Sequence, residues 1–190
     1  MNLFSTLVKP LCLCKAKKIG KHCGPYVNGR VLDVGSGRCL IAKELQENYN
    51  VRMTCIDVDD LNETSLPLIV YDGKKIPFGG GRFDTVLLVY VLHHCEDPVA
   101  VLKECRRVCK NGGKIIIFED FGFIWLTYFM DIVANRLHNV ATPLNFRSRK
   151  EWEKTFRRLG FSLIYSEDGV EKQVFYPFVE HTMFVLRVRK

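Results

Sequence analysis

The sequence predicts an α/β fold, a doubly wound and mostly parallel sheet of about seven strands in a single domain, with an antiparallel strand at its C-terminal end. Three observations lead to this prediction. Short apolar runs alternate with segments of helical periodicity after residue 30. The run at 84–91 is almost wholly apolar, which is typical of a central parallel strand covered on both faces. The last two runs leave no room for a helix between them, so we expect an antiparallel hairpin at the sheet edge.

Each expected element has its own local signal. The apolar runs predict strands at 30–34, 51–57, 68–71, 84–91, 114–118, 161–166 and 181–188. A helix is expected at 39–49, and a clearer one begins at Pro98, with Asp97 as its cap and Gly112-Gly113 as its end. A third helix is expected at 148–159, where Ser148 and Glu151 form a capping box.

Composition places the chain among ordinary globular domains. Its 190 residues are 47% hydrophobic and 26% charged, which excludes disordered, collagen-like and low-complexity proteins. This length supports one hydrophobic core and is too short for two. No run reaches the roughly 18 uncharged residues of a membrane-spanning helix.

The cysteines indicate a reducing compartment. Eight of them are scattered along the chain, and the N-terminus lacks the pattern of an export signal, so we expect reduced thiols in a cytoplasmic protein. Cys12, Cys14, His22 and Cys23 lie near one another, but their spacing is not a usual zinc pattern. No metal site is expected.

A glycine-rich turn carries the chemistry. The segment 31–37 reads as a strand that runs into Gly35 and Gly37, whose freedom at positive φ lets a ligand approach the backbone. No Gly-Lys-Ser/Thr follows, which excludes a phosphate-binding P-loop, and Leu40 replaces the third glycine of the dinucleotide fingerprint. Asp33 lies two residues before the turn, where an acid suits a ligand with a cationic ammonium group better than a pyrophosphate.

Two further acids follow the next strands. Asp57 lies 22 residues after Gly35, where a carboxylate accepts hydrogen bonds from ribose hydroxyls in doubly wound folds. Asp59 and Asp60 are alternatives to Asp57, and a solvated acidic turn is the simpler interpretation of both. Asp72, before Gly73, could accept a bond from an adenine amino group. Together the acids fit an adenosine that bears a zwitterionic side chain.

These motifs resemble a known family, the class I S-adenosylmethionine-dependent methyltransferases of the type 11 group. The resemblance runs from residue 31 to residue 120 through ordered motifs at 31–37, 57, 72–73, 76–78, 83–84, 91–94, 96–98, 102–104, 107–108 and 111–113. It implies a Rossmann-like fold and S-adenosylmethionine as cofactor. Residues 144–161 also resemble the closing helix and strand of that group. Cys39 stands at a commonly varied third glycine, and Asn111 replaces the usual proline.

The resemblance implies roles for particular residues. Asp33, Gly35 and Gly37 would hold the methionine part, with Ser36 beside them. Asp57 and Val58 would contact the ribose, and Asp72 with Gly73 the adenine. Tyr90 is a further candidate cofactor contact, lining the methyl site or packing in the core.

Catalysis needs little from the protein, because the sulfonium already activates its methyl group. His93 and His94 follow the fourth expected strand. His94 is our candidate base or substrate contact, and a structural histidine bonded to the backbone is the alternative. Glu119 and Asp120 end the fifth expected strand and could bind substrate or cap the next segment.

The acceptor is expected to be a small or lipid-like molecule, under a lid-like insertion at 121–146 that is aromatic in its first ten residues. RNA or protein is the alternative acceptor. No Asn/Asp-Pro-Pro-Tyr/Phe follows the fourth expected strand, which argues against methylation of exocyclic amino groups on nucleobases. A non-catalytic cofactor-binding or scaffold protein of the same fold is the second alternative.

Residues 1–29 form a basic leader before the domain at 30–190. The net charge is +7, and residues 1–30 hold six Lys and Arg and no acid, which leaves +1 for the rest. Leu3, Phe4, Leu7, Val8 and Leu11 fall at helical spacing, although Pro10 should limit a continuous helix. Residues 1–21 could therefore lie on an anionic membrane, contact phosphates of RNA, or cover the cofactor site with solvated lysines.

Overall fold

The computed structural model describes residues 3–122, 147–170 and 179–190. Most of the expected insertion at 121–146 therefore lies outside the described residues. The described chain contains a seven-stranded sheet in the order β3-β2-β1-β4-β5-β7-β6. Its strands are β1 Arg30–Val34, β2 Arg52–Asp57, β3 Leu68–Val70, β4 Phe83–Val89, β5 Cys109–Gly122, β6 Phe161–Asp168 and β7 Val179–Val188. This confirms the predicted doubly wound sheet.

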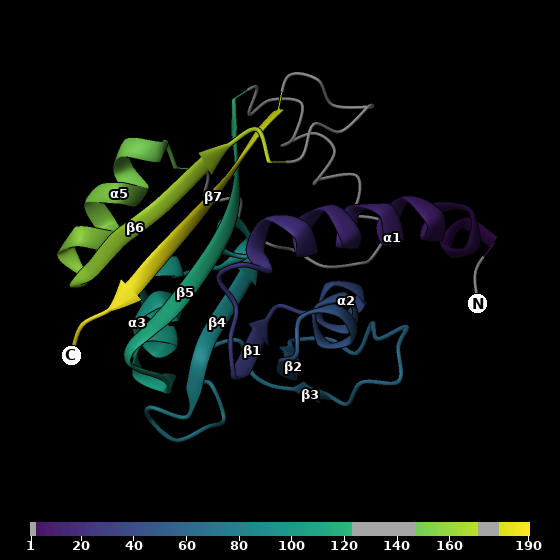
Figure 1. The fold of residues 1–190 in the computed structure, drawn as a ribbon, viewed down its shortest axis with the longest axis horizontal. Coiled ribbons are helices and arrows are strands. Elements are labelled where there is room, and N and C mark those ends of the chain that lie inside the picture. The colour runs from purple at the N-terminus through teal and green to yellow at the C-terminus, as the bar shows by residue number, and fades with distance from the viewer. Residues whose placement is uncertain (1–2, 123–146, 171–178) are drawn as a thin grey trace.

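Pairing directions also agree with the sequence. The strands β1 to β5 pair in parallel, whereas β7 runs antiparallel to both β5 and β6. The two C-terminal strands form the expected hairpin, with β7 inserted between β5 and β6 (Figure 1). The expected caps are present, because Asp97 accepts bonds from two backbone amides and Ser148 forms a complete capping box with Glu151.

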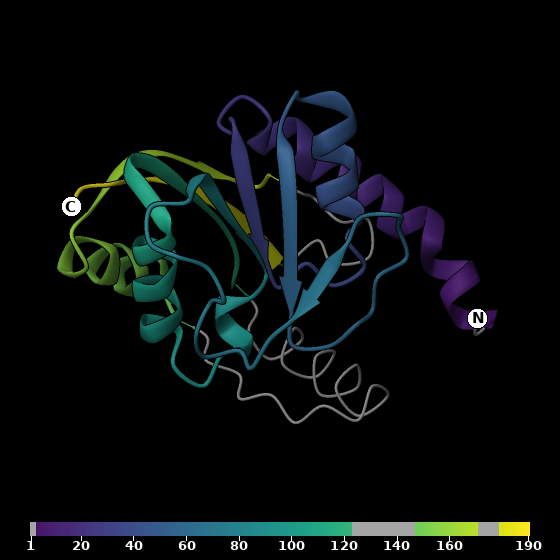
Figure 2. The same ribbon diagram turned by 90° about the horizontal axis from the view of Figure 1, so that it is seen from below.

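Helices cover both faces of the sheet, in two separate apolar clusters. The helices α1 Leu3–Cys23 and α2 Leu40–Asn48 lie on one face, and α3 Pro98–Val108 and α5 Arg149–Arg158 lie on the other (Figure 2). The short 3-10 helix η1 Leu92–His94 follows β4. Because the strands are buried on both faces, Val86, Leu87 and Leu88 are all 0% exposed.

The helix α3 ends four residues earlier than predicted. It stops at Val108, and Cys109 already begins β5. The amides of Gly81 and Arg82 donate to the last helical carbonyls, those of Arg107 and Val108, so the turn needs no glycine cap.

The N-terminal helix is continuous, contrary to the expected effect of Pro10. The helix α1 runs through Pro10, although proline removes one backbone donor and its ring crowds the preceding turn. Its later turns are held by tertiary packing, since Ala16, Ile19 and Cys23 are buried, and Ile19 and Cys23 lie in one cluster with Ala42 of α2. Burial of this stripe outweighs the cost of the proline.

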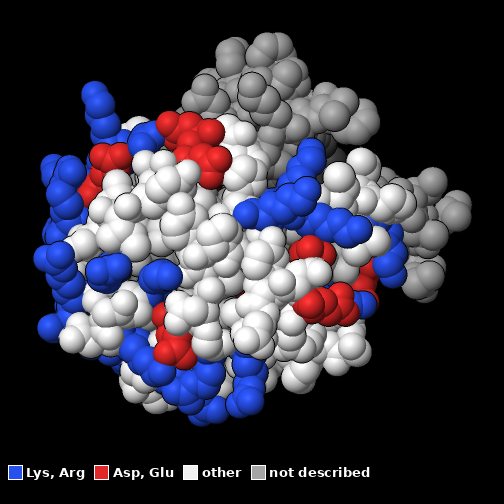
Figure 3. Space-filling view, viewed as in Figure 1, with Lys and Arg blue, Asp and Glu red and all other residues white. Residues whose placement is uncertain are grey.

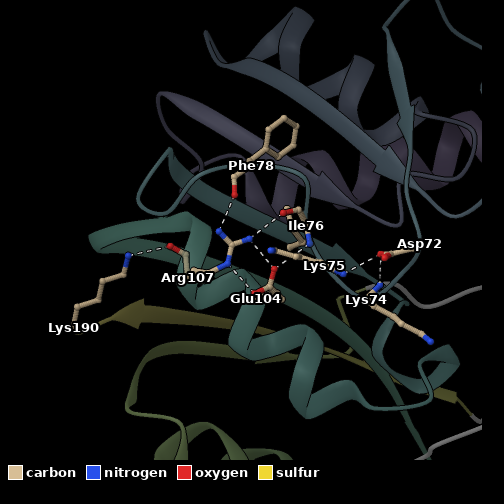
Figure 4. A network of polar contacts seen from close by, with 8 residues as sticks. All are labelled: Asp72, Lys74, Lys75, Ile76, Phe78, Glu104, Arg107 and Lys190. Carbon is tan, nitrogen blue, oxygen red and sulfur yellow. Dashed lines mark hydrogen bonds and ion pairs between the residues drawn. The ribbon is translucent and has the colours of Figure 1, made fainter.

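An arginine clamp fixes the loop between β3 and β4 (Figure 4). The guanidinium of Arg107 donates to the carbonyls of Phe78 and Ile76 at 2.7 and 2.9 Å, and it pairs with Glu104 at 2.7 Å. Glu104 in turn accepts a bond from the amide of Ile76 at 3.0 Å. The clamp therefore holds the segment that follows Asp72.

Replacing Arg107 by Met should lower the free energy of unfolding by about 1–3 kcal/mol, because two loop carbonyls lose a charged donor. Urea unfolding would measure this change. Lys103→Met is the matched control, since Lys103 is exposed on the same helix. Equal stability of both variants would show that the clamp is not needed to hold the loop.

No described helix combines the length and low charge required to cross a membrane.

Candidate functional site

The strand order places a switch point between β1 and β4. The chain proceeds outward from β1 through β2 to β3, and in the opposite direction from β4 to β5. Open α/β sheets bind ligands in the crevice outside the carboxyl ends of strands at such a point. The glycine turn follows β1, and Tyr90 follows β4, so both lie at this crevice.

Gly35 is required by its contact with the β4 side of the crevice. Its φ is +72°, and a Cβ added there would lie 2.5 Å from Cγ2 of Val91. Its amide donates to the carbonyl of Ile56 at 2.9 Å, which ties the turn to β2. No residue with a side chain fits this position without movement of Val91.

Gly37 faces open space. Its φ is +50°, and no described atom lies within 4 Å of an added Cβ. Its amide donates to Oδ2 of Asp57 at 2.6 Å, while Oδ1 of Asp57 accepts from the amide of Val58 at 2.7 Å. The sequence-predicted Gly37, Asp57 and Val58 are thus brought together, and Asp57 organises the turn around them.

Asp33 is a buried acid beneath the turn. It is 3% exposed, and burial raises its pKa to about 7. The hydroxyl of Ser36 opposes this rise, and the negative charge of Asp57 adds to it. A cationic group bound nearby would restore the ionised form, so Asp33 is suited to an ammonium ligand.

Asp72 and Gly73 lie in the loop after β3. Oδ1 of Asp72 accepts the amides of Lys74 and Lys75, both at 2.9 Å, and these bonds hold the pKa of Asp72 below its usual range. Gly73 has φ +71°, and an added Cβ would approach Cγ1 of Val58 at 3.0 Å. The structure therefore joins this loop to the Asp57 loop through Val58.

Tyr90 has an unusual backbone conformation. Its φ is +57°, so β4 ends at Val89, two residues earlier than predicted. Left-handed backbone at a bulky residue costs on the order of 1–3 kcal/mol and is concentrated at functional sites. The ammonium of Lys15 lies 4.1 Å from the Tyr90 ring centroid, and the His181 ring lies 5.3 Å from it.

His94 lies in η1, against His93. Their ring centroids are 4.1 Å apart, and burial together with the charge of His93 lowers the pKa of His94 to about 4. His93 is bonded to Glu119 at 2.7 Å, and Glu119 also accepts the amide of Leu92 at 2.9 Å. Glu119 thus positions the histidine turn, and His94 as catalytic base stays a prediction.

Sequence reasoning missed Lys15 and His181. Lys15 contacts the Tyr90 ring from α1, whereas the sequence predicted only solvated lysines if this segment covers the cofactor site. His181 reaches the same ring from β7, some ninety residues further along the chain, and it is bonded to Asp120. No local motif marks either residue, and only the position of β7 beside β5 could have indicated His181.

The residues at the crevice fit S-adenosylmethionine. The open space at Gly37 leaves room for a ligand against the backbone. A bound cation would stabilise the ionised form of the buried Asp33. Asp57 and Asp72 lie at neighbouring strand ends with oxygens that can accept hydrogen bonds. Within the described ranges, no three His, Cys, Asp or Glu side chains are grouped as metal ligands.

This fold and crevice define a nucleoside-binding α/β protein, and comparison with known proteins identifies its class. Residues 32–117 match the family described as a methyltransferase domain. Residues 32–117 thus form a methyltransferase domain of the type 11 group, and S-adenosylmethionine is the cofactor of this domain.

Curated relatives match over parts of their length. An uncharacterized protein of Methanocaldococcus jannaschii is 28% identical over 77% of this chain and 71% of its own length. A demethylmenaquinone methyltransferase of Corynebacterium efficiens is 28% identical over 55% of this chain and 50% of the relative. A tRNA (carboxymethyluridine(34)-5-O)-methyltransferase of Xenopus tropicalis is 31% identical over 48% of this chain and 14% of the relative. The chain thus spans half or less of the two relatives whose names state an activity.

A solved structure confirms the fold. A complex between the Haloferax volcanii Trm112 methyltransferase activator and a methyltransferase contains a chain with a TM-score of 0.71. The identity is 16%, over 93% of this chain and 91% of that one.

Proposed function

We propose that this protein transfers a methyl group from S-adenosylmethionine to a small-molecule or lipid-like acceptor. The carrying observation is the relation to quinone methyltransferases, whose substrates, by their names, are lipid-like rings. The intact crevice, with Asp33, Gly37 and Asp57 in place, supports turnover over a scaffold role.

The bound cofactor supplies an activated methyl group. Asp33 would bind the ammonium group, Gly37 would let the ligand approach the backbone, and Asp57 would accept the ribose hydroxyls. The left-handed Tyr90 would present its ring on the β4 side of the same crevice. The protein's contribution is to orient the acceptor and exclude water rather than to provide a covalent intermediate.

RNA is the second candidate acceptor. One relative is named as a tRNA methyltransferase, and basic side chains gather on the surface at α1 and at α5 (Figure 3). The helix α5 alone carries Arg149, Lys150, Lys154, Arg157 and Arg158 against two glutamates. Although the net charge of the domain after the leader is close to zero, α5 therefore presents a second basic surface, of a kind that contacts phosphates.

Transfer of a labelled methyl group distinguishes these candidates. The protein would be incubated with methyl-labelled S-adenosylmethionine and, separately, with the lipid, small-molecule and RNA fractions of a cell extract. Label in the lipid or small-molecule fraction supports the proposal, and label confined to RNA supports the second candidate. Gly37→Ala is the control, because its methyl group would occupy the space left for the cofactor.

We propose that residues 1–21 contact an anionic membrane surface at the periphery. Leu11 and Leu13 are 56% and 41% exposed, and Lys17, Lys18 and Lys21 are exposed on the same helix. Exposed apolar and basic side chains together suit an anionic lipid surface.

Two double variants test this contact. Leu11→Ser with Leu13→Ser, and separately Lys17→Glu with Lys18→Glu, should each reduce co-sedimentation with phosphatidylserine vesicles, because each removes one component of the attraction. Deletion of the helix is a poor test, since Ile19 is buried in the core. Unchanged sedimentation of both variants would refute the membrane contact.

A further inference from the structure

A histidine–aspartate pair, in which the histidine is buried and the aspartate half-buried, lies beside Tyr90 at the carboxyl end of β5. Nδ1 of His181 is hydrogen-bonded to Oδ1 of Asp120, and the two residues are directly opposite in the β5–β7 pairing. His181 is 4% exposed. Its Nε2 is buried and has no hydrogen-bond partner among the residues that the structure describes. A buried polar atom of this kind requires an explanation.

Strand alternation determines which face carries the pair. On β5, Ile116 and Phe118 belong to the apolar cluster under α1 and α2, so Asp120 continues that face. On β7, Met183 and Val185 belong to the same cluster, which places His181 on that face too. The pair therefore lies on the α1 face of the sheet.

The aromatic ring of Tyr90 connects the pair to the crevice. Its centroid is 5.3 Å from that of His181, at an interplanar angle of 70°, and the Lys15 ammonium contacts the same ring. Tyr90 follows β4, on the β4 side of the switch point. His181 is thereby placed beside the region where an acceptor would meet the methyl group.

The carboxylate of Asp120 selects the tautomer of His181. An ionised carboxylate can only accept hydrogen bonds, so Nδ1 must carry the proton that joins the two residues. In the neutral ring Nε2 then keeps a free lone pair. A histidine held in this way by a carboxylate is arranged to take up a proton at Nε2 and to have the resulting charge compensated.

We propose that His181, positioned by Asp120, accepts the proton that the methyl acceptor loses. This inference rests on the proposed methyl transfer to a small or lipid-like acceptor. The acceptor's proton passes to Nε2, the freed electron pair bonds to the methyl carbon, and the carbon–sulfur bond breaks with its electron pair to sulfur. The acceptor class is one with an ionisable proton at the reacting atom, such as a hydroxyl group.

His181 and His94 differ in their suitability for this role. Burial and His93 hold the pKa of His94 at about 4, so its ring is a weak proton acceptor near neutral pH. His181, by contrast, is hydrogen-bonded directly to the carboxylate of Asp120. Among the described residues, Asp120 pairs with His181, and the Lys15 ammonium lies on the Tyr90 ring that His181 also contacts.

Three measurements on the full chain test the inference. Nitrogen-15 spectra of the histidine rings at about pH 8 report the tautomer of the neutral form. We expect Nδ1–H and a bare Nε2 at His181, and a shift toward Nε2–H in Asp120→Asn. Calorimetry should show that His181→Gln binds S-adenosylmethionine as the wild type does. Methyl transfer into the extract fractions should fall about 100- to 10,000-fold in His181→Gln.

His22→Gln is the matched control, because His22 pairs with Glu167 in a partly exposed position between α1 and β6. It should change none of these measurements. Absence of cofactor binding by the wild type would refute the proposed function, whereas normal binding with undiminished transfer by His181→Gln would overturn this inference alone. An Nε2–H tautomer at His181 would also overturn this inference. The tautomer is the deciding measurement if the wild type transfers no label to any fraction.

Discussion

Asp33→Asn should abolish most S-adenosylmethionine binding and at the same time stabilise the ligand-free protein. The asparagine has no charge to offer an ammonium group, and loss of one partner of a buried charged hydrogen bond costs about 2–5 kcal/mol, or roughly 30- to 5,000-fold in affinity. Calorimetry would measure the affinity. The stability gain has a separate cause, the burial that raises the pKa of Asp33 to about 7.

The pH dependence of this gain has a definite sign. The pKa of Asp33 rises from 3.8 in the unfolded chain to about 7 in the folded chain, so between these values the folded state binds more protons. Its contribution to stability therefore falls as the pH rises from about 4 to about 7. At about 1.4 kcal/mol per pH unit, the advantage of Asp33→Asn should be about 2–3 kcal/mol larger at pH 8 than at pH 5.

Urea unfolding of both proteins at the two pH values measures this difference. Glu47→Gln, an exposed site on α2, is the charge-matched control and should show no such pH dependence. Wild-type affinity for the cofactor should rise over the same range, because the ammonium group needs the ionised carboxylate. If Asp33→Asn gains no stability and binds S-adenosylmethionine as the wild type does, Asp33 is not part of the cofactor site.

Gly35→Ala and Gly37→Ala should fail for different reasons. Gly35→Ala should lower the free energy of unfolding by about 2–4 kcal/mol, because it adds a clash with Val91 to an unfavourable φ. Gly37→Ala meets no described atom and has only the backbone penalty, about 1–2 kcal/mol. Its main effect should be lost cofactor binding, because its methyl group occupies the open space.

Chemical unfolding and calorimetry on both variants would separate these effects. Val91→Ala in the Gly35→Ala background should recover part of the lost stability, since it removes the contacting methyl groups. In the Gly37→Ala background it should recover nothing. Normal cofactor binding by Gly37→Ala would show that the ligand does not approach the turn at this position.

Local sequence patterns were enough to predict most of the fold. The β1 strand begins and ends where predicted, and the Ser148 capping box is present, because these signals act over a few residues. The errors occur where a distant segment decides the local structure. The amides of Gly81 and Arg82 end α3 early, and packing against α2 keeps α1 helical through Pro10.

For the site, the sequence by itself was enough to predict the cofactor side, since Asp33, Gly35, Gly37 and Asp57 belong to motifs that continuous chain segments carry, and their contacts with the cofactor stay predictions. Only the tertiary structure decided the other side. It showed the left-handed Tyr90, brought Lys15 to its ring, and paired His181 with Asp120 across two strands. The physical reason is that these residues are far apart in the chain. They meet only after α1 packs on the sheet and the antiparallel strand β7 inserts beside β5. The basic leader thus became a packed helix whose Lys15 contacts the crevice, in addition to its charge.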